Sequence, residues 1–180
     1  MRLTALAVAA GLALGLLGGG QVTRLGAIRL RWSVALWAGV GLQLLAGPFG
    51  VGGRPGTVAV IASYVALLGF AVANRGLTGM PVVLVGLALN ATVIVLNGGM
   101  PVRPAAVAAV GLDPAELDGT DLGAKRHLER PRERLPALGD VVPLRPLGEV
   151  VSFGDLVLAA GVANVVFRVM RPLRTTRAPA

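Results

Sequence analysis

The chain has 180 residues, of which 54% are hydrophobic and only 14% are charged, and its formal net charge is +8. Because soluble domains carry roughly 25% charged residues, this composition excludes an ordinary water-soluble domain and indicates a membrane protein. The chain has no cysteine and a single histidine, so we expect no disulfide, no metal and no other cofactor. The arginines lie singly between apolar runs, which favours membrane anchoring and argues against a nucleic-acid partner.

Apolar segments of about 20 residues, the length with which a helix crosses a bilayer, recur along the chain. The predicted spans are 3–20, 33–53, 57–74, 79–97 and 150–170. The predicted fold class is therefore all-α: a polytopic membrane helical bundle of about five transmembrane helices, forming one membrane domain over residues 1–180. Residues 98–149 separate the last two spans, and we expect them to be a long external loop with a short helix.

The first apolar run follows Arg2, as the apolar part of a signal peptide would. It is long, however, and no Ala-x-Ala cleavage site precedes Gln21, so we expect a helix that is retained in the mature protein. Cleavage of this segment as a signal peptide remains the alternative. Gly11, Gly15 and Gly19 are spaced four residues apart, which is typical of a small-residue stripe that lets another helix approach closely.

The distribution of arginine predicts the orientation of the chain in the membrane. Three arginines fall in the 24–31 loop, Arg75 falls in the next loop on the same side, and four more lie at the C-terminal end. Because short basic loops stay in the cytoplasm, we expect a multi-pass protein of the cell membrane with its N-terminus outside and its C-terminus in the cytoplasm. Residues 98–149 would then lie outside.

Within this external segment, the run Asp113-Pro114-Ala115-Glu116 predicts the start of a short helix. Asp113 is a good N-cap residue, proline fits the first helical position, and glutamate at the third completes a pattern similar to a capping box. We expect this helix to end near Gly119.

Asp155 is a carboxylate inside the last predicted span, where an ionised side chain is costly and therefore suggests a function. The alternative is that Asp155 or Ser152 simply caps the helix at its outer end. Asn90 and Asn97 are seven residues apart and share one face of the fourth span, and we expect both to face the bundle. We expect the Asn97 amide to donate to the Asp155 carboxylate in a site at the external face.

Asn97 also opens the tract Leu-Asn-Gly-Gly-Met-Pro-Val, in which Gly98 and Gly99 permit a tight turn. This tract, together with residues 138–144 and 152–161, resembles an uncharacterised bacterial membrane family, the domain of unknown function 5317. The resemblance implies a multi-span membrane protein with a basic, His-containing element between the first two tracts, where Lys125-Arg126-His127 stands here. It implies no established activity.

A second, local similarity is to the lipoprotein signal peptidase, a membrane aspartyl protease. Asp155 and Gly161 match its final Asp-x-x-Ile-x-x-Gly pattern with leucine in place of isoleucine, and Asn97-x-Gly99 stands in the right order. By this similarity Asp140 would be the second carboxylate, one acting as acid and one as base. Asp140 is followed by Val-Val-Pro, however, so the tract that carries the first aspartate of those peptidases is missing, and the chain has one span more.

The residues favour a binding role over catalysis. The predicted site lies on the outer face and binds a lipid, a peptide or a small solute; its residues are Asn90, Asn97, Gly98, Gly99 and His127. One alternative is an aspartyl-type membrane hydrolase, with Asp140 and Asp155 as its catalytic residues. Another is a transporter or membrane-complex subunit without a site of its own. Membrane lipid is the expected partner, with other membrane proteins as a further one.

Overall fold

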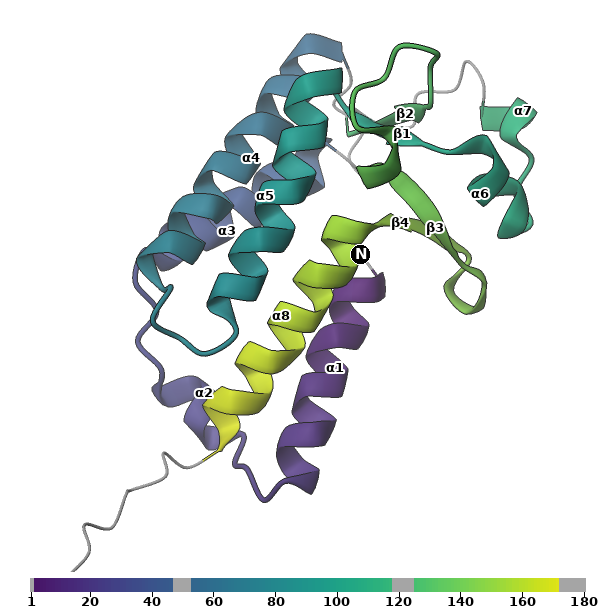
Figure 1. Cartoon of the computed structure of the whole chain (residues 1–180). Helices are drawn as coiled ribbons and strands as arrows, with labels where there is room; N and C mark the ends of the chain where they lie inside the picture. Colours follow the sequence, from purple (N-terminus) through teal and green to yellow (C-terminus); the bar gives the residue numbers. More distant parts are fainter. Residues whose placement is uncertain (1, 47–52, 118–124, 172–180) are drawn as a thin grey trace, which may run out of the picture.

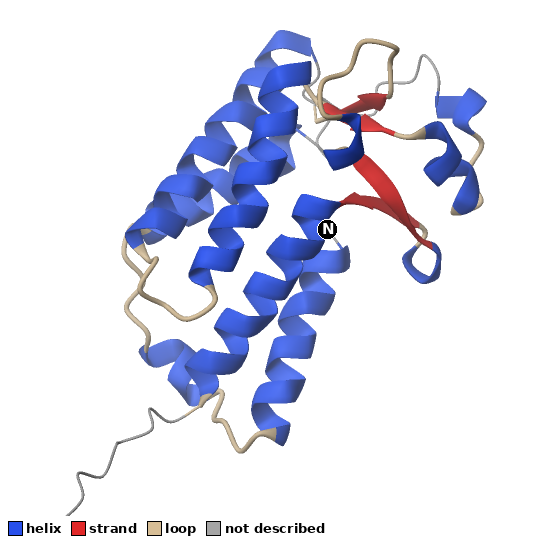
Figure 2. Cartoon of the chain, in the orientation of Figure 1, coloured by secondary structure: helices blue, strands red, loops and turns tan. Residues whose placement is uncertain are grey.

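The computed structural model describes residues 2–46, 53–117 and 125–171 (Figure 1). It is mostly helical, with a small sheet at one end of the helices (Figure 2). The main helices are α1 (Arg2–Leu17), α3 (Ser33–Ala46), α4 (Gly53–Ala73), α5 (Met80–Asn97) and α8 (Phe153–Met170), with the short α2 (Thr23–Ala27) between α1 and α3.

Three of these helices, α4, α5 and α8, are long and apolar enough to cross a membrane. The apolar helices α1 and α3 are shorter, at 16 and 14 residues. At 1.5 Å per residue they extend about 24 and 21 Å, against about 30 Å for the hydrocarbon core of a bilayer. Residues 47–52, near the end of the predicted span 33–53, lie outside the described residues. A mostly helical fold with three helices that could cross a membrane is thus confirmed, whereas the small sheet departs from the predicted all-α class and the number of spans stays a prediction.

The five main helices form a curved row in which α8 packs between α1 and α5, and α4 packs between α5 and α3. Helices α1 and α8 lie side by side and run in the same direction (Figure 1). At one end Arg2 Nη1 donates to the Leu147 carbonyl at 2.6 Å, and at the other the Gln21 amide donates to the Met170 carbonyl at 3.0 Å. Arg2 and Met170 therefore lie at opposite ends of the bundle.

Glycines set the closest helix contacts in the row. A Cβ placed on Gly11 would lie 2.7 Å from the Ala163 carbonyl oxygen, and one on Gly15 would lie 2.5 Å from Met170 Sδ. The predicted small-residue stripe thus packs against α8 at these two positions. Gly19 is not part of this contact, because it follows the helix with a positive φ of 74° and has open space around it.

The segment between α5 and α8 contains a four-stranded sheet, which the sequence analysis did not predict. The strands are β1 (Met100–Val102), β2 (Arg126–Leu128), β3 (Asp140–Leu144) and β4 (Glu149–Ser152), in the order β2-β1-β3-β4. β1 pairs in parallel with β2 and β3, and β3 pairs antiparallel with β4. The expected external loop is therefore a small folded unit, and we call its described residues, 98–117 and 125–152, the cap.

Short helical elements complete the cap: α6 (Pro104–Ala109), α7 (Pro114–Leu117), η1 (Pro136–Leu138) and η2 (Arg145–Leu147). The predicted start of α7 is confirmed, because Asp113 Oδ1 accepts a hydrogen bond from the Ala115 amide at 2.8 Å. Its predicted end near Gly119 lies outside the described residues.

Candidate functional site

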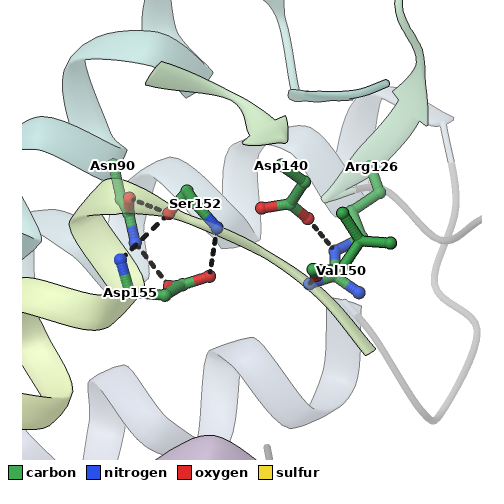
Figure 3. A network of polar contacts seen from close by, with 6 residues as sticks. All are labelled: Asn90, Arg126, Asp140, Val150, Ser152 and Asp155. Carbon is green, nitrogen blue, oxygen red and sulfur yellow. Dashed lines mark hydrogen bonds and ion pairs between the residues drawn. The ribbon is translucent and has the colours of Figure 1, made fainter. Parts of the chain in front are cut away.

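A buried polar network joins α5 to the start of α8 (Figure 3). Asn90 Nδ2 donates to Asp155 Oδ1 at 2.7 Å, and Ser152 Oγ donates to Asn90 Oδ1 at 2.8 Å. Asn90 and Ser152 are 1% and 0% exposed. Every hydrogen-bonding group of this small network therefore has a partner on another element or in the helix start itself, as burial of polar groups requires.

Two of these residues also form a capping box at the N-terminus of α8. The Asp155 amide donates to Ser152 Oγ at 2.9 Å, and the Ser152 amide donates to Asp155 Oδ2 at 3.4 Å. A carboxylate in this position is stabilised by the positive end of the helix dipole. Asp155 therefore combines the capping role, which the sequence left open as an alternative, with a hydrogen bond to the neighbouring α5.

The predicted pair of Asn97 with Asp155 is wrong. Asn97 Nδ2 donates to the Arg134 carbonyl at 2.9 Å, and its Oδ1 accepts from the Arg134 amide at 2.8 Å. The helix α8 begins deeper in the bundle than α5 ends (Figure 1), which brings Gly154 against Asn90. Asn90 is therefore the partner of Asp155, and Asn97 holds a loop of the cap instead.

The turn that follows Asn97 brings the predicted glycines and histidine together. Gly98 ends α5 with a φ of 70°, a left-handed conformation that favours glycine. A Cβ on Gly99 would lie 2.8 Å from His127 Nδ1. His127 Nε2 lies 2.8 Å from Glu133 Oε1, so the described contacts give this histidine a structural role within the cap.

Asp140 lies in the cap beside β4 and is 1% exposed. Its Oδ2 lies 2.8 Å from Arg126 Nε in an ion pair, while neither carboxylate oxygen receives a well-aligned hydrogen bond from the described residues. Burial raises the pKa of Asp140 from its ordinary value of 3.8 to about 6, although the Arg126 guanidinium acts in the opposite direction. Arg126 Nη2 also contacts the Val150 carbonyl at 3.4 Å.

The two aspartates do not share a partner. Asp155 accepts from Asn90 and Ser152, whereas Asp140 faces Arg126, and Ser152 lies between the two carboxylates in Figure 3. A hydrolytic aspartyl pair requires two carboxylates around one water or proton. Within the described residues each carboxylate has its own side-chain partner, Asn90 for Asp155 and Arg126 for Asp140.

A cavity of about 420 Å³ lies next to this network, on the inner side of the curved row of helices. All five main helices and the cap contribute to its lining. Its polar lining residues are Thr4, Gln43, Tyr64, Lys125, Arg126, Glu149 and Asp155. Apolar lining residues include Leu36, Val40, Leu67, Phe70, Leu158 and Val162.

The polar lining residues gather at the cap end of the cavity, together with Leu3 and Val151, whereas the lining further into the bundle is apolar. Lys125, Arg126 and Glu149 belong to the cap, and Asp155 lies in the first turn of α8 beneath it. On the α3–α4 pair, Trp32 contacts Gly69 and Gly39 contacts Leu67, so the two helices are antiparallel. Gln43 follows Gly39 by one turn toward the cap. The cavity is therefore polar beneath the cap and apolar further into the bundle.

The chain matches the model of a known protein family over most of its length. Residues 27–167 match the model of a family described as a family of unknown function, DUF5317. The chain belongs to the DUF5317 family. No curated protein and no solved structure matches the chain. The family match covers the cap and α3, α4 and α5, and it includes most of α8.

In this DUF5317 protein the three tracts that carried the resemblance lie together. Met100 pairs with Arg126 and Pro101 with His127, while Val102 pairs with Asp140, which in turn pairs with Ser152. The sheet therefore places the asparagine-glycine tract, the basic element and the two aspartate tracts in one layer above the cavity.

Sequence reasoning missed Tyr64 and Lys125 as members of the site. Tyr64 is the single tyrosine of the chain and lies in the middle of α4, where a polar hydroxyl needs a partner. Its position in a predicted span therefore indicated that its hydroxyl contacts another polar group. Lys125 was named only as part of the basic element, because nothing in the sequence shows that its side chain reaches the cavity.

Proposed function

We propose that this protein binds a membrane amphiphile, with an apolar chain in the inner part of the cavity and a polar head group beneath the cap. The observation that carries the proposal is the division of the cavity into a polar and an apolar end. Ligand pockets of roughly 300–1,000 Å³ that are mainly apolar, with a few polar groups, are typical of small-molecule sites. A volume of about 420 Å³ falls in this range.

The position of the cavity supports a ligand that arrives from the membrane. Helices α1 and α3 stand at the two ends of the curved row, and both contribute lining residues, among them Leu3, Leu36 and Val40. In a bilayer, apolar helices of this kind are surrounded by lipid chains. An amphiphile can therefore move from the surrounding lipid into the cavity while its polar head group stays at the level of the cap.

For the membrane arrangement we propose five crossings, with the N-terminus and the cap outside the cell membrane and the C-terminus in the cytoplasm. The bundle end opposite the cap carries the loop arginines at positions 24, 29, 31 and 75 together with Arg168 and Arg171, which fits the preference of basic loops for the cytoplasm. A reporter fused to the C-terminus should be active only in the cytoplasm, and one inserted in the cap only outside. Both reporters in one compartment would rule this arrangement out.

Binding is tested with two photoreactive 16-carbon amphiphiles, an alcohol and a carboxylate, added to the purified protein in nanodiscs. We expect saturable crosslinking to residues of α3 and α8 that line the cavity. Val40→Phe and Val162→Phe fill the apolar end and should weaken crosslinking of the bound probes at least tenfold. Val34→Phe is the matched control, because Val34 lies on α3 but is 79% exposed and does not line the cavity.

The proposal fails if neither amphiphile crosslinks saturably to cavity residues. It also fails if Val40→Phe and Val162→Phe change labelling no more than Val34→Phe does. Circular dichroism and size-exclusion profiles of the three variants should match those of the wild type, which shows that a loss of labelling does not come from unfolding.

A further inference from the structure

The cap places a lysine at the polar end of the cavity in a fixed position. Lys125 directly precedes β2, and its carbonyl accepts a hydrogen bond from the Met100 amide at 2.6 Å. Its ammonium Nζ lies 5.8 Å from the centre of the Tyr64 ring, in the range of a cation–π contact. The backbone is thus held by the sheet, while the side chain points down to the middle of α4.

Lys125 differs from Arg126, the neighbouring cation in the cavity wall. Arg126 is engaged by the buried Asp140 at 2.8 Å and contacts the Val150 carbonyl. In the described parts of the chain, no carboxylate lies within ion-pair distance of the Lys125 ammonium. Among the acids of the cavity wall, Asp155 already accepts hydrogen bonds from Asn90 and Ser152. The Lys125 ammonium, which has a hydrogen bond with the Tyr64 side chain and three N–H groups in all, therefore keeps donors for a ligand.

We propose that the amphiphile bound in this cavity has a head group with a single negative charge, a carboxylate or a phosphodiester, and that Lys125 recognises it. This inference rests on the proposed function. An ammonium that is partly removed from water and held against an aromatic ring gains most from an anionic partner, because the surrounding dielectric is low. The Gln43 side chain has no hydrogen-bond partner within the described residues, and it adds a neutral donor at the same end.

The acids at this end limit the charge of the head group. Asp155 and Glu149 line the same part of the cavity as Lys125 and Arg126, so the formal charges of these four side chains sum to zero. Asp140 further neutralises Arg126 from outside the cavity wall. Within the described residues Arg126 is engaged by Asp140 and Arg2 lies 4.0 Å from Glu149, so the cavity lining has no further cation to balance a second negative charge on the ligand. The cavity is therefore expected to prefer a monoanionic head group over a dianionic phosphomonoester.

The test compares head groups on the same chain, using the photoreactive hexadecanoate and hexadecanol. Wild-type protein should bind hexadecanoate at least tenfold more tightly than hexadecanol, and Lys125→Gln should remove this preference by weakening hexadecanoate binding. Lys125→Arg should retain the preference, which also shows that the cap tolerates substitution at this position. Arg132→Gln is the control for loss of one positive charge, because Arg132 is exposed in the cap and does not line the cavity.

Competition with unlabelled lipids distinguishes the sources of the anion. Displacement by phosphatidylglycerol at lower concentrations than by fatty acid identifies the phosphodiester, and the reverse order identifies the carboxylate. Equal binding of hexadecanol and hexadecanoate, or a Lys125→Gln variant that keeps the preference, would overturn the inference and leave the proposed function intact. Absence of saturable labelling by both probes would instead remove the proposed function itself.

Discussion

Asn90 connects α5 to α8, and replacing it by leucine is expected to destabilise the bundle strongly. The substitution nearly keeps the volume but removes the donor to Asp155 Oδ1 and the acceptor for Ser152 Oγ. A hydrogen bond to a charged group contributes about 1.5–3 kcal/mol and a neutral one about 1 kcal/mol. Because Asn90 is 1% exposed, water cannot replace either partner, and the expected loss is about 3 kcal/mol.

The assay is reversible unfolding in mixed micelles, compared between Asn90→Leu and Thr92→Val. Thr92 lies on the same helix, is exposed, and donates to the Ala88 carbonyl of its own helix, so its substitution should change stability by less than about 0.5 kcal/mol. Asn90→Asp gives a second test, since it places a carboxylate beside Asp155 and should regain stability as the pH falls and one carboxyl becomes protonated. An Asn90→Leu variant as stable as wild type would refute the role of this network.

Three further predictions concern the cap and the helix contacts. Because the pKa of Asp140 is raised from 3.8 to about 6, the folded protein holds a proton between these pH values that the unfolded chain releases, so its free energy of unfolding should fall by about 3 kcal/mol as the pH rises from 4 to 6. Amide exchange in the cap should show this loss of stability, and Asp140→Asn should remove the pH dependence. A wild-type stability that rises over this range relative to Asp140→Asn would contradict the prediction. Gly161→Leu should unfold or separate α5 and α8, because a Cβ there lies 2.6 Å from the Val83 amide, while Gly41→Leu, which has open space, should be tolerated; equal thermal stability of the two would contradict the packing. His127→Phe should loosen the 125–134 region by removing the 2.8 Å contact to Glu133, measured as faster amide exchange in the cap, and unchanged exchange would show that the contact contributes nothing.

The long apolar helices follow from the sequence alone. A helix in hydrocarbon makes its backbone hydrogen bonds within its own segment, so a long apolar window is sufficient to predict it. The predicted spans 57–74, 79–97 and 150–170 accordingly correspond to α4, α5 and α8. The start of α7 was predictable for the same reason, because an N-cap and its amide partner are neighbours in the sequence.

The cap sheet was not predictable from the sequence, because its strands have only three to five residues. Strands this short do not produce a recognisable alternation of apolar and polar side chains. A proline in the central strand β1, Pro101, also argues against a strand, since it has no amide to donate. What stabilises these strands is pairing with segments distant in the sequence, such as that of Val102 in β1 with Asp140 in β3.

The packing of α8 against α5 determines which asparagine contacts Asp155. Asn90 and Asn97 share one face of α5 and differ by about 10 Å of rise, so the sequence placed both toward the bundle but could not choose between them. The choice follows from the depth at which α8 begins, and close contacts of Gly86 with Leu158 and of Gly161 with Val83 set that depth. The cavity depends on the same packing, because it lies between helices whose relative positions are fixed by glycine contacts and by the cap.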